Sequence, residues 1–400
     1  MGLPMDGTAG LRGRRTPDPA LLDDPVALEE NDPGGMLRFT ASAGAQVRES
    51  ATLAAEANLA ALAEDGRPRA VVVAGVGTAG RTGDILATVA GPRCPVPVLS
   101  HRSAGIPGWV GAADVVIAVS ASGRSPEALA AAVAAARRGA RLVAVGAPNS
   151  QLQEVAERAR APFVPVPRRA PARASLWALT IPVLLAARAL GLVRVTEADL
   201  AETAARLDAD AERCRPSAES FVNPAKSLAL NLAGSIPIVW GSSPLATVAA
   251  RRFADVLSAN ARYPVVAGAL GEAGRGRVGL LDGVFGGLVE AERDIFADPD
   301  EQPDATRLRV VLLRDGGLNA GDDADEPLAV EERRADALLA LAERRGVRCD
   351  VVTAEGGSTL ERLASLIAVP DFASVYLALA HGLDPMAVPA VTEMKELANP

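Results

Sequence analysis

The sequence predicts an α/β protein with two tandem domains, each a doubly wound parallel sheet with helices on both faces. Short apolar runs such as Val115 to Val119 alternate with helical patterns, and the loops between them are short. Uniformly apolar strands are typical of parallel sheets whose two faces are both covered by helices. The alternation restarts near residue 220, after Pro216. We therefore expect domains at 20–215 and 216–400, preceded by a disordered tail at 1–19.

The first half shows enough β-α alternation to build one complete sheet. Helical patterns end at glycine and proline, as at Gly66 and Pro68. We expect strands at 70–74, 95–99, 115–119, 142–145 and 163–166. We expect helices at 21–31, 37–65, 126–138 and 152–160, one from about 85, and a long apolar one after Arg173.

The second half repeats this arrangement. An amphipathic helix at 196–213 leads into it. We expect strands at 236–240, 308–313 and 347–352. We expect helices at 223–233, 244–257, 328–345, 359–368 and 372–381, then a short last helix that carries Glu393 and Lys395.

The composition narrows the class of protein. Of 400 residues, 49% are hydrophobic but only 3% aromatic, so we expect cores built from Ala, Val and Leu. A net charge of −8 argues against a nucleic-acid or anionic-membrane surface as partner. No apolar run approaches the ~20 residues that span a bilayer. The first residues lack the apolar core of a secretory signal.

Cysteine and histidine are scarce. The three cysteines are scattered without disulfide or metal spacing, so we interpret them as reduced. Two histidines leave little room for a metal site. We expect a soluble cytoplasmic protein with no metal, no cofactor, and neither nucleic acid nor membrane as partner.

The segment VVIAVSASGRSPE, Val115 to Glu127, is the strongest functional signal. A buried strand breaks into Ser120, Ser122, Gly123 and Ser125, and Pro126 begins an alanine-rich helix. Amide N–H groups at a helix N-terminus attract anions, and small hydroxyls bind phosphate oxygens without crowding them. The segment therefore indicates a phosphate site. The alternative is an ordinary turn that happens to contain serines.

A glycine-rich segment, GVGTAGRTGD, follows the first strand. Gly75, Gly77 and Gly80 are similar to a dinucleotide-binding fingerprint, although that pattern is weak by itself. A dinucleotide site also needs an acidic residue after the second strand, and Ser100 and His101 stand there instead. Because both segments follow parallel strands, we expect them to share one crevice at the carboxyl edge of the sheet.

Taken together, these motifs resemble the sugar isomerase (SIS) family, and within it the bifunctional phosphoglucose/phosphomannose isomerases, TobH-like branch. The resemblance runs from Leu21 to the C-terminus. It is carried by LLDDPVALEENDPGGM, GVGTAGRTGD, SASGRSPE, PARASLWAL and DFASVYLALAHGLDPMAVPAVTEMKE, in this order and spacing. It implies two tandem SIS domains of the flavodoxin-like αβα type, a phosphorylated sugar as ligand, and a homodimer.

The resemblance also implies roles for individual residues. The family's sugar-phosphate loop falls on Ser120, Ser122, Gly123, Ser125 and Glu127. Its glycine-rich loop falls on Gly75, Gly77 and Gly83–Asp84, but the serine of its GGS is missing, with Thr78 and Ala79 there instead, and Thr78 is a candidate phosphate ligand. The family's arginine falls on Arg173, which residue chemistry alone leaves as a solvated loop charge or a phosphate ligand. The family's lysine falls on Lys395, at the C-terminal helix that returns to the crevice, where it would aid ring opening or charge stabilisation.

Two departures from the family concern the chemistry. Ala259, in SANAR, replaces the glutamate that moves the C2 proton, and the segment 269–277 lacks the family histidine. Glu272 is the nearest carboxylate; it is either a replacement base with a burial-raised pKa or a solvated surface charge. His381 is expected to complement a helix dipole.

Three functions remain open from the sequence. The first is an aldose–ketose isomerase that interconverts glucose or mannose 6-phosphate and fructose 6-phosphate with an atypical base. The second is a catalytically silent sugar-phosphate sensor or partner protein. The third is a nucleotide-binding oxidoreductase that uses Gly75 to Gly80.

Overall fold

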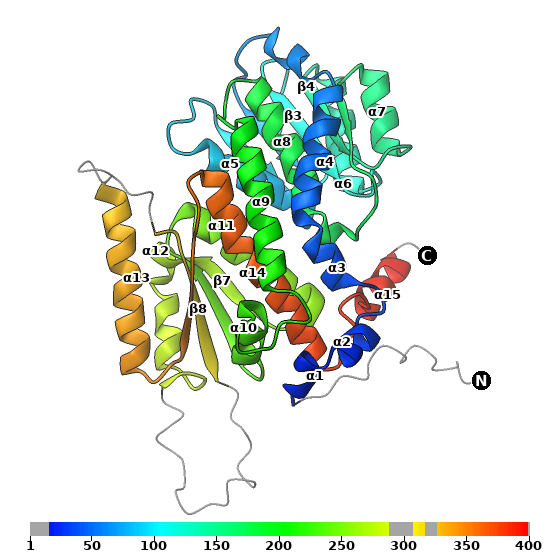
Figure 1. Cartoon of the computed structure of the whole chain (residues 1–400). Helices are drawn as coiled ribbons and strands as arrows, with labels where there is room; N and C mark the ends of the chain where they lie inside the picture. Colours follow the sequence, from blue (N-terminus) through cyan, green and yellow to red (C-terminus); the bar gives the residue numbers. More distant parts are fainter. Residues whose placement is uncertain (1–15, 288–306, 317–325, 399–400) are drawn as a thin grey trace, which may run out of the picture. The chain divides into compact units, whose positions relative to one another are not determined.

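The structure is a computed structural model that describes residues 16–287, 307–316 and 326–398. The chain divides into two compact units (Figure 1). Unit 1 contains Met1–Arg38, Asp210–Gly357 and Ser365–Pro400, and unit 2 contains Phe39–Ala209 and Ser358–Ala364, as far as these ranges are described. Each unit holds one parallel sheet.

The sheet of unit 2 has five parallel strands in the order β2-β1-β3-β4-β5. The strands are β1 (Val71–Ala74), β2 (Val98–His101), β3 (Val115–Ser120), β4 (Arg141–Gly146) and β5 (Phe163–Pro165). The helices are α3 (Met36–Ala41), α4 (Ala43–Glu56), η1 (Leu59–Ala63), α5 (Thr78–Ala90), α6 (Pro126–Arg137), α7 (Gln151–Ala159), η2 (Ala172–Ala174), α8 (Leu176–Ala189) and α9 (Glu197–Arg213).

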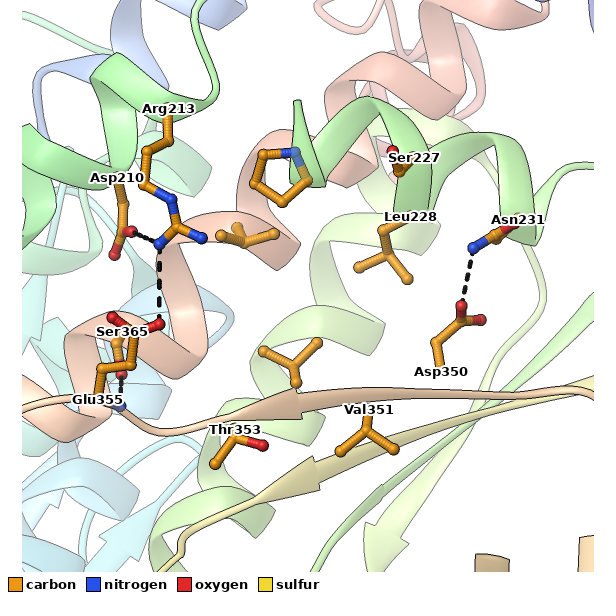
Figure 2. Close-up of a pocket in the computed structure, with 13 residues that line it drawn as sticks. Asp210, Arg213, Ser227, Leu228, Asn231, Asp350, Val351, Thr353, Glu355 and Ser365 are labelled. Atoms are coloured by element: carbon orange, nitrogen blue, oxygen red, sulfur yellow. Dashed lines mark hydrogen bonds and ion pairs between the residues drawn. The ribbon is translucent and has the colours of Figure 1, made fainter. Parts of the chain in front are cut away.

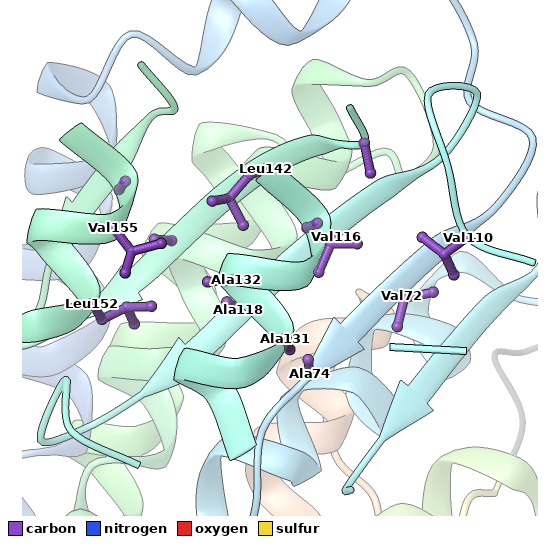
Figure 3. Close-up of a cluster of buried hydrophobic side chains, with 14 residues drawn as sticks. Val72, Ala74, Val110, Val116, Ala118, Ala131, Ala132, Leu142, Leu152 and Val155 are labelled. Carbon is purple, nitrogen blue, oxygen red and sulfur yellow. The ribbon is translucent and has the colours of Figure 1, made fainter. Parts of the chain in front are cut away.

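Helices cover both faces of this sheet. Helices α6 and α7 pack together on one face, and α5 packs on α8, which packs on α4, on the other. The buried cluster under α6 and α7 consists entirely of Ala, Val and Leu (Figure 3). Alanines 131, 132 and 135 of α6 are fully buried, so that helix approaches the sheet closely. The expected aliphatic core is confirmed here.

The sheet of unit 1 has four described strands in the order β7-β6-β8-β9, all parallel. The strands are β6 (Ile236–Gly241), β7 (Val266–Ala269), β8 (Leu308–Arg314) and β9 (Cys349–Thr353). The helices are α1 (Ala20–Asp23), α2 (Pro25–Asn31), α10 (Pro224–Leu232), α11 (Pro244–Val256), η3 (Leu257–Ala261), α12 (Leu270–Ala273), η4 (Arg277–Asp282), α13 (Glu326–Arg344), α14 (Thr359–Ala380) and α15 (Pro389–Ala398).

Four predictions about elements were wrong. The helix expected at 21–31 is two helices, α1 and α2, because the Asp24 side chain caps the start of α2. Strand β7 was missed, because its sequence VAGA is short and weakly apolar. The helix expected at 37–65 is broken, since Asn58 takes a left-handed conformation that stops α4. The two helices expected at 359–368 and 372–381 are one helix, α14, which continues through Pro370. Its residues around the proline are buried, and packing of that kind outweighs a proline cost of about 3 kcal/mol.

The expectation that no apolar run approaches the length of a membrane span was wrong for helix α14. By length and composition its 22 residues could cross a bilayer, with a mean hydropathy of 1.8 over an 18-residue window. That window is 94% buried inside the protein, as expected of a core helix.

The predicted first domain, 20–215, includes the N-terminal helices α1 and α2. In the structure these helices group with the second half of the chain, in unit 1. The Asp23 side chain accepts hydrogen bonds from the backbone and hydroxyl of Ser220, at 2.8 and 2.7 Å. The Asp18 amide donates to the Ala380 carbonyl at the end of α14. The tail predicted at 1–19 lies outside the described residues up to position 15.

Candidate functional site

The crevice predicted at the carboxyl edge of the first sheet lies at a topological switch point. Strand β1 pairs with β2 on one side and β3 on the other, so the chain leaves β1 and β3 in opposite directions. Helix α5 follows β1 and helix α6 follows β3, and each begins at this edge. Ligands of open α/β sheets bind at such points, because two helix N-termini converge there.

The β3–α6 loop is shaped by its own serines. The Ser120 hydroxyl is buried and accepts a hydrogen bond from the Ser125 amide at 3.3 Å. The Ser122 hydroxyl, half-buried, accepts from the Arg124 amide at 3.2 Å. Ser120 therefore holds the loop, and Ser122 is the better placed to reach a ligand.

Ser125 occupies the N-cap of α6 without capping it. Its side chain accepts no hydrogen bond from the helix, and its hydroxyl donates instead to Glu127 at 2.8 Å. The first-turn amides of α6 are therefore left without a side-chain cap from Ser125, which is the arrangement that an anion can complete.

Glycine is required at two positions in this edge. Gly123 has φ +65°, and a Cβ there would come within 2.0 Å of the Ser150 hydroxyl oxygen. A Cβ on Gly75 would come within 2.8 Å of the Val119 carbonyl oxygen. The loop after β1 therefore lies against the end of β3, and the loop after β3 lies against the start of α7. The first contact brings the two predicted motifs together.

The glycine-rich loop ends in the N-terminus of α5. Gly77 is the N-cap, exposed, with φ +58°, and Thr78 begins the helix half-buried. The Asp84 carboxylate, further along α5, binds Arg81 at 3.0 Å and also Arg102. Asp84 therefore has a structural role in this ion-pair cluster, while Gly77 and Thr78 lie where a ligand can approach.

Arg173 and His101 are further residues of unit 2 near this edge. Arg173 is half-buried in η2, which packs against α5. His101 ends β2, and its carbonyl accepts from the Gly75 amide at 3.0 Å. The Nε2 atom of His101 is buried with no hydrogen-bond partner among the described residues. Since β2 ends on histidine and not on an acid, the dinucleotide hypothesis lacks its ribose-binding carboxylate.

The remaining predicted residues belong to unit 1. Glu272 lies on α12, after β7, and its side chain is exposed. Glu272 therefore has the solvated position of a surface charge, which is the alternative to a buried replacement base. Lys395 is also exposed, on α15.

Ala259 lies in η3, a π-helical turn that ends α11. The next residues tie this turn to the C-terminal segment. Asn260 donates to the Ser374 hydroxyl at 2.9 Å, and Arg262 donates to the carbonyls of Asp384, at 3.0 Å, and Ala387. The segment that leads to Lys395 is therefore held by the same turn that carries Ala259.

A Tyr–His pair in this region was not predicted. The Tyr263 hydroxyl lies 2.6 Å from Nε2 of His381, and it accepts a hydrogen bond from the Gly234 amide at 3.0 Å. Burial raises the pKa of Tyr263. His381 is itself buried in this contact, which a helix-dipole role did not anticipate. No sequence signal links positions 118 residues apart.

Residues 221–397 match the model of the bacterial phospho-glucose isomerase C-terminal SIS domain. The chain is also 27% identical, over 330 residues, to a bifunctional phosphoglucose/phosphomannose isomerase of Caldicellulosiruptor bescii. The aligned region covers 81% of this chain and 88% of that protein. The chain is therefore similar, over most of its length, to the bifunctional phosphoglucose/phosphomannose isomerases, and its residues 221–397 match a SIS domain of that kind.

Solved structures agree with the family at the level of the fold. A hypothetical protein from Thermus thermophilus has a TM-score of 0.67 at 15% identity, covering 95% of this chain and 94% of its own. A glucose-6-phosphate isomerase like protein from the same organism has a TM-score of 0.52 at 18% identity, with 94% and 99% covered.

A third similar structure is the C-terminal domain of glucosamine-fructose-6-phosphate aminotransferase from Francisella tularensis. It has a TM-score of 0.57 at 13% identity, with 87% of this chain and 96% of that chain covered. At these identities the similarity concerns the fold alone, and the predicted two-domain SIS α/β fold is confirmed.

Proposed function

We propose that this protein binds phosphorylated sugars and interconverts hexose 6-phosphates, namely glucose or mannose 6-phosphate and fructose 6-phosphate. The observation that carries the proposal is the β1/β3 switch point, where a serine-bearing loop and a glycine-rich loop meet beneath the N-termini of α5 and α6. A phosphate ester is the ligand that this arrangement suits best, because uncapped amides and small hydroxyls converge there.

Each residue of the site has a distinct part in the proposal. Ser122 and Thr78 donate their hydroxyls to the phosphate, and Ser125 does so when its hydroxyl turns away from Glu127. Gly77 and Gly123 let the backbone approach the phosphate. Arg173 supplies a positive charge, and its planar fork can hold two oxygens. Ser120 positions the loop from its buried site.

The isomerisation step needs a base that shuttles a proton between C1 and C2. Ala259 cannot do this, so we assign the base to Glu272 and ring opening or charge stabilisation to Lys395. Both side chains are exposed, so substrate is free to reach them. A carboxylate that becomes enclosed only with substrate would be dehydrated at that moment, which favours proton transfer.

A silent sugar-phosphate-binding protein is the second candidate. Two observations favour it: alanine at position 259, and the absence of histidine from the segment 269–277. Binding would then persist without turnover, because the phosphate-binding residues all lie on unit 2 and do not depend on a base.

One experiment separates the two functions. Glucose, mannose and fructose 6-phosphate are tested for thermal stabilisation and for isomerisation with the same protein samples. Both candidates predict about 2–3 kcal/mol of stabilisation at a hundredfold excess over the dissociation constant. Turnover supports the isomerase, and stabilisation without turnover supports the silent protein. No shift with any phosphohexose would exclude both.

Variants locate the binding site. Ser122→Ala and Arg173→Ala are expected to weaken phosphohexose binding at least about tenfold, since each removes a hydrogen bond to a charged group. Ser217→Ala, an exposed serine of unit 1, is the matched control and leaves binding unchanged. Equal affinity of all three variants for phosphohexoses would show that the ligand binds at another site.

The base is tested separately. Glu272→Gln is expected to lower kcat about 10²- to 10⁴-fold and to leave phosphohexose binding intact. Glu64→Gln, an exposed carboxylate of unit 2, serves as control. An unchanged kcat in Glu272→Gln would show that Glu272 is not the base, and it would not affect the proposal of the phosphate site.

A cytoplasmic location, a homodimer and membership of the TobH-like branch stay predictions. Light scattering of the purified chain tests the dimer.

A further inference from the structure

A groove of about 380 Å³ runs along the edge of the second sheet, within unit 1 (Figure 2). Strand β9 forms one wall and helix α10 lies opposite it, with α14 and the end of α9 at one end. Its lining residues are Asp210, Arg213, Pro224, Ser227, Leu228, Asn231, Asp350, Val351, Val352, Thr353, Glu355, Ser365 and Val369. None of these belongs to the phosphosugar site proposed above.

The strand in this wall is an edge strand. Among the described strands β9 pairs only with β8. The Val310 amide donates to the Arg348 carbonyl and the Ala354 amide donates to the Arg314 carbonyl. The even-numbered residues around β9 therefore face β8, because a parallel ladder uses alternate residues. The N–H and C=O groups of Val351 and Thr353 point away from β8, toward the open edge.

The opposite wall runs alongside this edge. Pro224, Ser227, Leu228 and Asn231 are spaced three or four residues apart, so they share one face of α10. Asn231 bridges the two walls at one point, where its amide donates to Asp350 at 2.8 Å. A strand edge that faces a helix across a narrow groove has the shape that extended peptides use when they add to a sheet.

We propose that this groove binds an extended peptide segment of another protein, one that carries basic side chains, as an added strand on β9. The backbone groups of Val351 and Thr353 would hold the peptide backbone. The apolar side chains of Val352, Leu228 and Val369 would receive its alternate apolar side chains. This inference is independent of the proposed function.

The negative charge of the groove favours a peptide with basic side chains. The lining contains three carboxylates, Asp210, Asp350 and Glu355, against one arginine, Arg213. Arg309 lies outside the lining and pairs with Asp350 at 2.5 Å, which still leaves one negative charge in excess. Arg213 binds Asp210 at 2.9 Å and lies 3.9 Å from Glu355. Because the Glu355 side chain is 53% exposed, an incoming cation can still reach it at the end of the groove.

The test uses three capped eight-residue peptides and the full chain. The first alternates valine and lysine, the second alternates valine and glutamate, and the third is the valine–lysine peptide with every amide N-methylated. Fluorescence anisotropy is expected to show binding of the first and at least about tenfold weaker binding of the other two. Equal binding of the glutamate or the N-methylated peptide would overturn the proposal.

Variants of the groove identify the site. Val351→Pro removes an outward N–H that the β8 ladder does not use, and edge strands tolerate proline. It is expected to weaken the valine–lysine peptide at least about fivefold. Asn231→Arg, at an exposed position, places a cation in the groove beside Asp350 and should have the same effect without changing a residue of the sheet. Full affinity in both variants would overturn the proposal.

Glu355→Gln measures the charge contribution. It is expected to cost about two- to fivefold in affinity for the lysine peptide, as a partly exposed ion pair does. Glu64→Gln, an exposed carboxylate of unit 2, is its control and should leave affinity unchanged.

Two other occupants would also overturn the proposal. The chain's own basic N-terminal segment is the occupant if the lysine peptide binds only after Arg12, Arg14 and Arg15 are replaced by serine. A second copy of the chain is the occupant if Val351→Pro converts a dimer to a monomer while no peptide binds.

Discussion

At the scale of single residues, the candidate site depends on positions where no side chain fits. Gly123 combines a positive φ with a close approach to Ser150, whose hydroxyl caps α7 and donates to the Ala147 carbonyl at 2.7 Å. The Leu152 amide also donates to the Gly123 carbonyl at 3.0 Å. The serine loop is therefore built against the start of the next helix, which holds it in place before any ligand arrives.

Gly123→Ala should therefore cost about 2–4 kcal/mol of stability, since it adds left-handed strain and displaces a helix cap. It should also weaken phosphohexose binding. Gly139→Ala is the matched control: φ is +69°, but the nearest atom to its added Cβ lies 4.0 Å away. That variant should lose about 1–2 kcal/mol in urea unfolding and keep its binding. Equal losses would show that the Ser150 contact is unimportant.

At the scale of elements, one ion pair joins the entrances of the two strands that form the switch point. Arg69 precedes β1 and Asp114 precedes β3. The Asp114 carboxylate, fully buried, accepts from Arg69 at 3.0 and 2.6 Å and from the Gly111 amide at 2.8 Å. The hydrogen bonds from Arg69 hold the pKa of Asp114 below its usual value. These bonds set β1 and β3 side by side at the amino edge of the sheet.

This depressed pKa makes the contribution of Asp114 dependent on pH. The stabilisation is present above the unfolded-state pKa of about 4 and is lost as the pH falls through the lower folded-state value. Asp114→Asn should cost about 1.5–3 kcal/mol at pH 7, and the difference from the native protein should shrink below about pH 4. Urea unfolding at several pH values measures this.

The control is a surface ion pair of the same unit. Asp208 pairs with Arg48 at 2.8 Å, with side chains 47% and 55% exposed. Asp208→Asn should cost less than about 1 kcal/mol at pH 7. A cost of Asp114→Asn that stays constant down to pH 2 would contradict the assignment.

At the scale of the whole molecule, the first and the last helices that the structure describes, α1 and α15, both belong to unit 1. Lys226 of α10 is central to this arrangement. It is fully buried, donates to the carbonyls of Pro216 and Ala218 at 2.7 Å each, and lies 3.6 Å from Asp23. Burial lowers the pKa of Lys226. The N-terminal helices are therefore held to the second half of the chain by a buried cation.

Lys226→Met should accelerate amide hydrogen exchange in α1, α2 and α10, because it leaves two buried carbonyls without their donor and removes the cation beside Asp23. Exchange in strands β1 to β5 of unit 2 should stay unchanged. Asp114→Asn provides the reciprocal comparison, since it should accelerate exchange in unit 2 alone. Acceleration spread evenly over both units in either variant would mean that they unfold as one.

The sequence by itself determined the α/β class, eight of the nine described strands and the two motifs on which the proposed phosphate site rests. It could do so because uniformly apolar runs, serine and glycine clusters and helix starts are local features. Tertiary structure alone decided that β1 and β3 are neighbours and that the N-terminal helices join the second half of the chain. It also decided that Ser120 is buried while Glu272 is exposed, and that the Tyr263 hydroxyl contacts His381. The physical reason is that burial and pairing depend on residues far apart in the chain, whose contacts no local pattern specifies.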